Sequence, residues 1–390
     1  MGIRQRTLEN LVAARARRLV SDMKTILITG NMGYVGPWVL RHLRESRPQA
    51  TLIGYDMGYF SHCLTRAAIL PECRTDLQYF ADVRSVPEKI LEGVDGIIHL
   101  AAISNDPMGK AFEELTQEVN HRATVRLATL AKQAGVRSFV FASSCSVYGF
   151  AEEGARTESS SLNPLTAYAQ SKVAAERDLA PLADSRFRVT CLRFATACGM
   201  SERLRLDLVL NDFVASAVAT NRITILSDGT PWRPLINVKD MARALDWALD
   251  RTTGEDYLVV NAGSDEWNYQ IRELAEAVAR VIPGVQISMH PDAQPDKRSY
   301  RVDFSLFRRL APDHQPQMDL ETTVQELRQG LEAMRFRDPD FRNSAFMRLK
   351  VLEELRRQGL LNEQLEWTNR ARAHRREAAT SVNAPVPVRS

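Results

Sequence analysis

The sequence has few of the features that mark secreted or metal-binding proteins. Its 390 residues include only five cysteines, at positions 63, 73, 145, 191 and 198, and these form no CxxC pair. A disulfide framework and a zinc site of the usual Cys/His spacing are therefore not expected, and no metal is predicted. An odd, scattered set of thiols fits the reduced state, so we expect a cytoplasmic protein.

Long apolar runs and a strong charge of either sign are also missing. No apolar run approaches the roughly 18–20 residues that a membrane span needs. The formal net charge is only +3, with much of the basic excess in the two ends, so no nucleic-acid partner is expected. Residues 1–22 are basic but lack the apolar core of a signal peptide. We interpret them as an N-terminal extension, with a membrane-surface or targeting helix as the alternative.

What the sequence does contain is a glycine-rich turn between a strand pattern and a helix pattern. Residues 24–36 read KTILITGNMGYVG, and their aliphatic run leads into Gly30, Gly33 and Gly36. Such a turn at a helix N-terminus suits the pyrophosphate of a dinucleotide, because glycines permit a tight turn, close approach of the ligand and close packing of helix on strand. Alternatively, these glycines serve only to turn the chain. The residues that follow distinguish a dinucleotide site from a simple turn.

Those downstream residues supply further parts of a dinucleotide site. A strand predicted at 51–55 ends at Asp56, about 20 positions after the glycines, where a carboxylate would bind the ribose hydroxyls. A carboxylate there repels a 2′-phosphate, which favours NAD over NADP. Further strands are predicted at 77–81, 95–102, 137–142 and 187–193, and one long helix at 113–134. This alternation predicts an α/β fold with a Rossmann doubly wound parallel sheet.

The later part of the chain predicts a second, smaller unit. We expect an NAD-binding domain over residues 23–195, with returning segments near 233–262. Residues 196–342 are expected to form mainly a C-terminal substrate-binding α/β cap. A polar loop is predicted at 155–166. The charge-rich residues 343–390 predict a helical extension and a disordered tail.

The chemistry is expected at a tyrosine and a lysine four positions apart. Tyr168 and Lys172 would share one face of a helix. Tyrosine has an ordinary pKa near 10, and a nearby ammonium group favours the phenolate. Tyr168 could then take a proton from a hydroxyl or give one to a carbonyl. A YxxxK pattern is common by chance, but here it follows the glycine turn, an acidic residue and a strand that ends in serines.

Together these motifs make the chain similar to the extended short-chain dehydrogenase/reductase family, the nucleotide-sugar epimerases and dehydratases. The resemblance covers about residues 24–303 and rests on TGNMGYVG (29–36), Asp56, Asp82-Val83, HLAA (99–102), Asn120, SSCSVYG (143–149), YAQSK (168–172), Arg193 and RPLINVKD (233–240). It implies NAD as the cofactor, a nucleotide-sugar substrate and a homodimer formed through helices near 113–134 and 166–184.

The resemblance also implies roles for individual residues at the cofactor. The three glycines would hold the pyrophosphate, and Asn31 and Met32 would supply backbone amides. Asp56 would contact the ribose, and Asp82 and Val83 the adenine. Lys172 would bind the nicotinamide ribose, in a cleft lined by Leu100, Ala101 and Ala102.

For the substrate, the resemblance implies contacts from several segments. Ser144 would hydrogen-bond the reacting hydroxyl, and Arg233 would bind the diphosphate. Asn211 would contact the nucleotide, and either Arg298 or Arg301 would be a second diphosphate ligand. Thr196 stands where the family commonly has a phosphate-binding asparagine, and Ser146 is a further expected contact.

The residues after Ser144 narrow the choice of reaction. The related 4,6-dehydratases carry an Asp-Glu pair where this chain has Cys145-Ser146, and the related decarboxylases usually have a glutamate at the position of Ser146. Elimination and decarboxylation of the usual kind are therefore not expected. The cysteine of GDP-fucose synthase would also fall on Ser146, so Cys145 is expected to be a packing residue.

What remains is NAD-dependent oxidoreduction at a sugar carbinol, which in this family is most often carbon 4. A nucleotide-sugar 4-epimerase is the first choice, with a 4-dehydrogenase or 4-ketoreductase left open. A 4,6-dehydratase and a non-catalytic NAD-binding regulator are less favoured.

Overall fold

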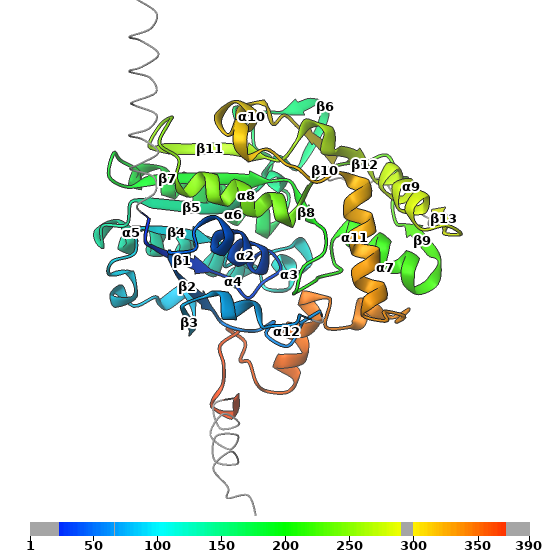
Figure 1. Cartoon of the computed structure of the whole chain (residues 1–390), viewed down its shortest axis with the longest axis horizontal. Helices are drawn as coiled ribbons and strands as arrows, with labels where there is room; N and C mark the ends of the chain where they lie inside the picture. Colours follow the sequence, from blue (N-terminus) through cyan, green and yellow to red (C-terminus); the bar gives the residue numbers. More distant parts are fainter. Residues whose placement is uncertain (1–22, 66, 290–298, 372–390) are drawn as a thin grey trace, which may run out of the picture.

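A parallel seven-stranded sheet forms the centre of the computed structural model, which describes residues 23–65, 67–289 and 299–371. Figure 1 shows this sheet with helices on both faces and a smaller cap beside it. Its order is β11-β7-β5-β4-β1-β2-β3. The strands are β1 (Thr25–Thr29), β2 (Thr51–Asp56), β3 (Leu77–Phe80), β4 (Gly96–His99), β5 (Ser138–Ser144), β7 (Arg188–Phe194) and β11 (Tyr257–Ala262). The predicted doubly wound sheet is therefore confirmed.

Alternate residues of the strands face two separate cores, as the period of two in a strand requires. Ile26 and Ile28 of β1 belong to the core beneath α2 (Gly36–Ser46) and α8 (Val238–Leu249). Leu27 between them belongs to the core beneath α5 (Ala123–Gln133) and α6 (Ala167–Leu179). Both faces of the sheet are thus covered, which is why β1 and β2 read as continuous apolar runs.

The long helix predicted at 113–134 is confirmed, with a π-helical turn inside it. It divides into α4 (Glu113–Gln117), a π-helical segment (Glu118–Arg122) and α5. Asn120 lies in the π-helical segment, fully buried. Its side chain accepts a hydrogen bond from the Ile103 amide (2.8 Å) and donates one to Ser171 Oγ (3.1 Å). The Asn120 side chain therefore links the segment after β4 to α6.

The cap is built from later helices and three small sheets. Its helices are α7 (Val209–Thr220), α9 (Ile271–Val281) and α11 (Leu320–Ala333). β10 (Trp232–Asn237) pairs with β8 (Thr196–Cys198) and β12 (Asn268–Gln270), and β9 (Arg222–Ile225) pairs with β13 (Gln286–Met289). β6 (Phe150–Arg156) pairs with β14 (Ser299–Val302), so the loop predicted at 155–166 begins inside a strand.

The segment predicted to return to the large domain is divided between the two units. α8 packs on β4, β5 and β7, and β11 adds the outermost strand beside β7. β10, which comes first in that segment, lies in the cap sheet instead. α10 (Ser305–Leu310) then packs against β11.

The C-terminal part of the described chain packs back onto the large domain. α12 (Arg348–Arg357) contacts α3 (Asp106–Ala111), and a third core joins Leu352, Leu361 and Leu365 to Ile103 and Met108. The N-terminal extension predicted at 1–22 and the tail from 372 onward lie outside the described residues. Within the ranges that the structure describes, no helix is long and apolar enough to cross a membrane, and no cluster of His, Cys, Asp and Glu could hold a metal ion.

Candidate active site

The glycine turn after β1 has the geometry that its sequence predicts. Gly30 has φ +73°, and a Cβ atom there would lie 2.5 Å from the backbone nitrogen of Ala101. A Cβ at Gly36 would lie 2.0 Å from the carbonyl oxygen of Asn31, so this glycine lets α2 start directly against the turn. Any side chain at either position would force the backbone apart.

One cavity of about 910 Å³ collects most of the predicted site residues. It lies at the carboxyl ends of the parallel strands, where ligands bind in open α/β sheets. Of the predicted cofactor and substrate residues, those that line it are Gly30, Gly33, Asp56, Asp82, Val83, Leu100, Ala101, Ala102, Ser144, Ser146, Tyr168, Lys172, Thr196 and Arg233.

Asn31 and Met32 lie behind the cavity wall and hold the turn in place. The Asn31 side chain is fully buried, and its Nδ2 donates to Gln78 Oε1 at 2.7 Å. The Met32 amide donates to Asp56 Oδ2 at 3.1 Å, and the Gly58 amide donates to Asp56 Oδ1 at 2.7 Å. Burial raises the pKa of the Asp56 carboxyl, while these two amide hydrogen bonds lower it. Asp56 thus links the end of β2 to the glycine turn.

Asp82 is held by a neighbouring arginine. The Arg84 guanidinium forms a two-pronged ion pair with Asp82, with Nη2 at 2.6 Å and Nε at 2.9 Å from Oδ2. The Arg84 amide also donates to Asp82 Oδ1 at 2.8 Å. Arg84 lines the cavity beside Asp82 and Val83, so the end expected for adenine carries a fixed ion pair.

Ser144, Tyr168 and Lys172 meet at the other end of the cavity, where β5 ends beside α6. Burial raises the pKa of Tyr168 to about 12, and a hydrogen bond with Ser144 lowers it. Burial lowers the pKa of Lys172 to about 7, although the nearby Glu176 carboxylate raises it. Lys172 Nζ donates to the Ala142 carbonyl at 2.7 Å and lies 5.6 Å from the centre of the Tyr168 ring. The three groups can therefore exchange a proton with a bound hydroxyl.

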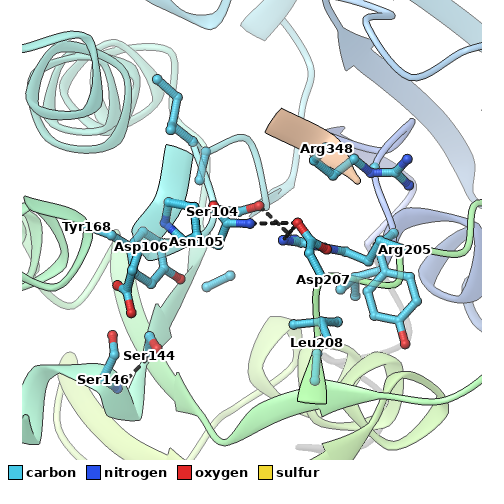
Figure 2. A pocket seen from close by; sticks show the side chains of 18 of the residues that line it. Ser104, Asn105, Asp106, Ser144, Ser146, Tyr168, Arg205, Asp207, Leu208 and Arg348 are labelled. Carbon is cyan, nitrogen blue, oxygen red and sulfur yellow. Dashed lines mark hydrogen bonds and ion pairs between the residues drawn. The ribbon is translucent and has the colours of Figure 1, made fainter. Parts of the chain in front are cut away.

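Ser146 and Cys145 point to different surroundings. Cys145 is buried and absent from the cavity lining, and its Sγ contacts the Arg193 carbonyl oxygen at 3.1 Å. Burial raises the pKa of this thiol, which supports a packing role. The Ser146 amide donates to Ser144 Oγ at 3.1 Å, as the dashed line in Figure 2 marks. Ser146 Oγ is buried and has no hydrogen-bond partner among the described residues.

A polar cluster that the sequence did not predict lies on the opposite wall. Figure 2 shows Arg205 and Asp207 across the cavity from Ser144 and Tyr168. Arg205 donates to both oxygens of Asp207, at 2.5 and 2.9 Å, and its Nη1 donates to Ser104 Oγ at 2.9 Å. Asn105 Nδ2 donates to Asp207 Oδ2 at 2.6 Å. Ser104 and Asn105 could have been predicted to line the cavity, because they come directly after a strand with small residues at its end. Nothing in the sequence around Arg205 and Asp207 indicated a place in the cavity.

Two further cavity residues were also not foreseen. Asp106 opens α3, and its Oδ1 accepts a hydrogen bond from Thr166 Oγ1 at 2.8 Å. Thr166 is the N-cap of α6, the helix that carries Tyr168. Arg348 comes from α12 and is buried, with Nη2 donating to the Arg203 carbonyl at 2.7 Å. Both Asp106 and Arg348 line the cavity.

The predicted substrate residues divide into those at the cavity and those away from it. Asn211 is fully buried outside the lining: its Oδ1 accepts from the Gly199 amide (3.0 Å), and its Nδ2 donates to Tyr34 Oη (2.9 Å). These contacts give it a structural role in place of the expected nucleotide contact. Arg301 is exposed, lies over the Trp232 ring and is absent from the lining, so its role as a diphosphate ligand stays a prediction. Arg298 lies outside the described residues.

Comparison with known proteins places this site in a family. The model of the NAD dependent epimerase/dehydratase family matches residues 26–263. UDP-glucose 4-epimerase of Streptomyces lividans is 27% identical over 273 residues, which cover 65% of this chain and 80% of that protein. dTDP-glucose 4,6-dehydratase of Streptomyces griseus is 28% identical over 244 residues, which cover 61% and 73%.

A solved structure agrees in fold over most of the chain. MoeE5 in complex with UDP-glucose and NAD is 25% identical, with a TM-score of 0.67 over 79% of this chain and 99% of that one. The names of these relatives cover more than one reaction, so the choice among reactions depends on the residues in the cavity.

Proposed function

Since this chain belongs to the NAD-dependent epimerase/dehydratase family, we propose that it oxidises and re-reduces a carbinol of a nucleotide sugar and acts as a nucleotide-sugar 4-epimerase. The observation that carries this proposal is the meeting of Ser144, Tyr168 and Lys172 in one cavity whose adjoining positions, 145 and 146, hold no carboxylate. Elimination of the family's usual kind places its acid and base at those positions.

The residues at the glycine end fit NAD, which accepts and returns the hydride when bound. Gly30 leaves backbone room that any Cβ would fill, since Ala101 is already in contact range. Asp56 is fixed beside the turn by the Met32 and Gly58 amides, where its carboxylate can bind ribose hydroxyls. Its negative charge disfavours a 2′-phosphate.

Tyr168 is the group that moves the proton. Ser144 lies close enough to Tyr168 to lower the pKa of its phenol, and both residues line the cavity, so a sugar hydroxyl bound there would meet both. Ser144 orients the sugar oxygen, and Tyr168 takes its proton as the carbinol becomes a ketone. Tyr168 then returns the proton when the ketone is reduced from its other face.

Lys172 supports this exchange by its charge and its position. With its pKa lowered to about 7, the side chain is partly protonated near neutral pH. A protonated Lys172 beside the Tyr168 ring stabilises the phenolate, which burial alone disfavours. The buried Ser146 hydroxyl, without a protein partner in the described residues, is suited to a hydroxyl of the sugar.

The same residues would serve a 4-dehydrogenase or a 4-ketoreductase. A second candidate reaction is elimination, which one observation favours. Asp106 places a carboxylate in the cavity, from an element other than the one that carries it in the related 4,6-dehydratases. If Asp106 were the base of an elimination, Asp106→Asn would abolish turnover. Under the epimerase proposal, the variant keeps measurable epimerisation.

The test is to incubate the purified protein with a panel of nucleotide sugars, with and without added NAD, and to identify the products by NMR. Formation of the 4-epimer without net NADH supports the proposal. Accumulation of a ketone or of NADH would instead indicate a dehydrogenase, and a 4-keto-6-deoxy sugar would indicate a dehydratase.

We also propose a cytoplasmic homodimer. All five cysteines are free, as suits a reducing compartment. The helices near 113–134 and 166–184 are the expected dimer face, because family members pair through them. Light scattering after size exclusion would test the mass, with a single-chain mass of 43.9 kDa contradicting the dimer.

A further inference from the structure

Beyond the family match at residues 26–263, the chain continues into a segment that lies against the cofactor end of the cavity. After α12, residues 359–368 fold into a short hairpin, which we call the C-terminal hairpin. We propose that this hairpin is the outer wall of the adenosine half of the NAD site and slows the release of NAD. The identity of the bound group rests on the proposed function.

The C-terminal hairpin is a closed unit held by its own hydrogen bonds. Leu361 and Trp367 pair as an antiparallel bridge, and the Thr368 amide donates to the Leu360 carbonyl at 3.0 Å. The Leu365 amide donates to the Asn362 carbonyl at 3.1 Å across the turn. Leu365 has φ +56°, a conformation that a leucine adopts only when its surroundings require it.

Those surroundings include Met57 and Tyr59, which lie shortly after Asp56 in the chain. Trp367 Nε1 donates to the Met57 carbonyl at 2.8 Å, one position after Asp56. The Tyr59 hydroxyl donates to the Leu365 carbonyl. Figure 1 shows the orange segment after α12 beside β2 and β3, the strands that end in this region. The hairpin is therefore fastened to the edge of the cavity where adenosine is expected.

Arg84 connects the hairpin to Asp82. Its Nη2 donates both to Asp82 Oδ2 at 2.6 Å and to the Gln364 carbonyl at 2.9 Å. The Arg84 guanidinium thus binds both Asp82, which is expected to contact adenine, and the tip of the hairpin. Moving the hairpin outward must break this bond as well as those of Trp367 and Tyr59.

The hairpin also contributes directly to the cavity surface. Gln364 and Leu365 line the same cavity as Asp56, Asp82 and Val83. Leu365 is only 3% exposed and packs in the core that includes Ile103, Tyr59 and Phe60. A bound adenosine would therefore be covered by the hairpin, and its departure requires these contacts to open.

Slow release has a use in the proposed reaction. An epimerase oxidises and reduces the same sugar, so one NAD molecule must stay bound between the two hydride transfers. A dehydrogenase, in contrast, must exchange NADH for NAD in every turnover. A wall that retains the dinucleotide therefore favours the epimerase cycle over the dehydrogenase cycle.

The test measures NADH release from the full-length protein by its fluorescence, after mixing with excess NAD and without any sugar. Trp367→Phe and Tyr59→Phe each remove one hydrogen bond to or from the hairpin and keep an aromatic ring. Because a hydrogen bond contributes about 0.5–1.5 kcal/mol, we expect release about two- to twelvefold faster for each. A chain that ends at Gln358 should release NADH at least about tenfold faster.

Glu363→Ala is the matched control, because Glu363 lies exposed at the tip of the same hairpin. Release should change by less than about twofold, as expected for a surface substitution. Release within twofold of the intact chain for both the double variant Tyr59→Phe/Trp367→Phe and the shortened chain would overturn the proposal. If the shortened chain does not fold, as judged by its thermal unfolding, the double variant decides alone. Since no turnover is measured, this result is independent of whether the protein is an epimerase.

Discussion

At the scale of single residues, burial sets the proton affinities that the sequence could only suggest. The spacing of Tyr168 and Lys172 predicted their proximity, and the structure places both in the cavity. It also raises the pKa of Tyr168 to about 12 and lowers that of Lys172 to about 7, in each case mainly by burial. From the sequence, the ammonium group of Lys172 is expected to favour the phenolate, whereas burial of Tyr168 opposes its ionisation.

Removing the phenol oxygen tests the role of Tyr168. Tyr168→Phe keeps the aromatic ring on α6 but removes the hydroxyl that we propose moves the proton, so turnover should fall about a hundred- to ten-thousandfold. NAD binding, measured by titration of the protein fluorescence, should stay close to that of the intact chain. Retained turnover in this variant would mean that another group carries the proton.

The buried Lys172 predicts a pH-dependent stability. The unfolded chain keeps the lysine proton up to about pH 10.5, whereas the folded chain loses it above about pH 7. Unfolding therefore takes up a proton between these two pH values. Burial of Lys172 lowers the free energy of unfolding by its largest amount below pH 7, and this loss disappears as the pH rises to 10.5. Each unit of pKa shift is worth about 1.4 kcal/mol.

Lys172→Met should consequently raise the melting temperature more at pH 6 than at pH 9, measured without cofactor. The half-exposed Lys350, changed to Met, is the control and should show no such difference. An equal effect of Lys172→Met at both pH values would contradict a lowered pKa at this site.

At the scale of elements, local patterns with a strong backbone requirement were predicted best. The glycine turn, its strand and its helix were predicted because Gly30 needs φ +73° and Gly36 needs close packing. The long helix over 113–134 was predicted but its π-helical turn was not, because nothing in its apolar pattern signals that Asn120 bonds to Ile103. That requirement comes from tertiary contacts.

A pair of glycines with the same backbone angle isolates the role of the turn. Gly30 and Gly93 both have φ +73°, but a Cβ at Gly93 meets nothing within 4 Å. Alanine at either position should cost about 1–2 kcal/mol for the left-handed backbone. Gly30→Ala should also destabilise the protein further and abolish the stabilisation by NAD in thermal unfolding, whereas Gly93→Ala keeps it. Equal behaviour of the two variants would contradict the proposed place of the pyrophosphate.

At the scale of the whole molecule, the cavity is assembled from segments far apart in the chain. Ser144 is the last residue of β5, Arg205 and Asp207 come from the entry to the cap, and Leu365 comes from the C-terminal hairpin. The motifs predicted the first of these, since their spacing along the chain is local. Asn211 shows the limit of assigning roles by resemblance to a family. Its position suggested a substrate contact, but its hydrogen bonds to Gly199 and Tyr34 hold it behind the cavity.

The most direct test of the central claim follows a deuterium atom at carbon 4 of whichever nucleotide sugar the protein turns over. Oxidation and re-reduction at that carbon by one retained NAD predicts a 4-epimer that keeps its deuterium, with no free NADH and no exchange with solvent. Loss of the deuterium to water, or build-up of the ketone, would contradict both the 4-epimerase chemistry and the retention of the cofactor.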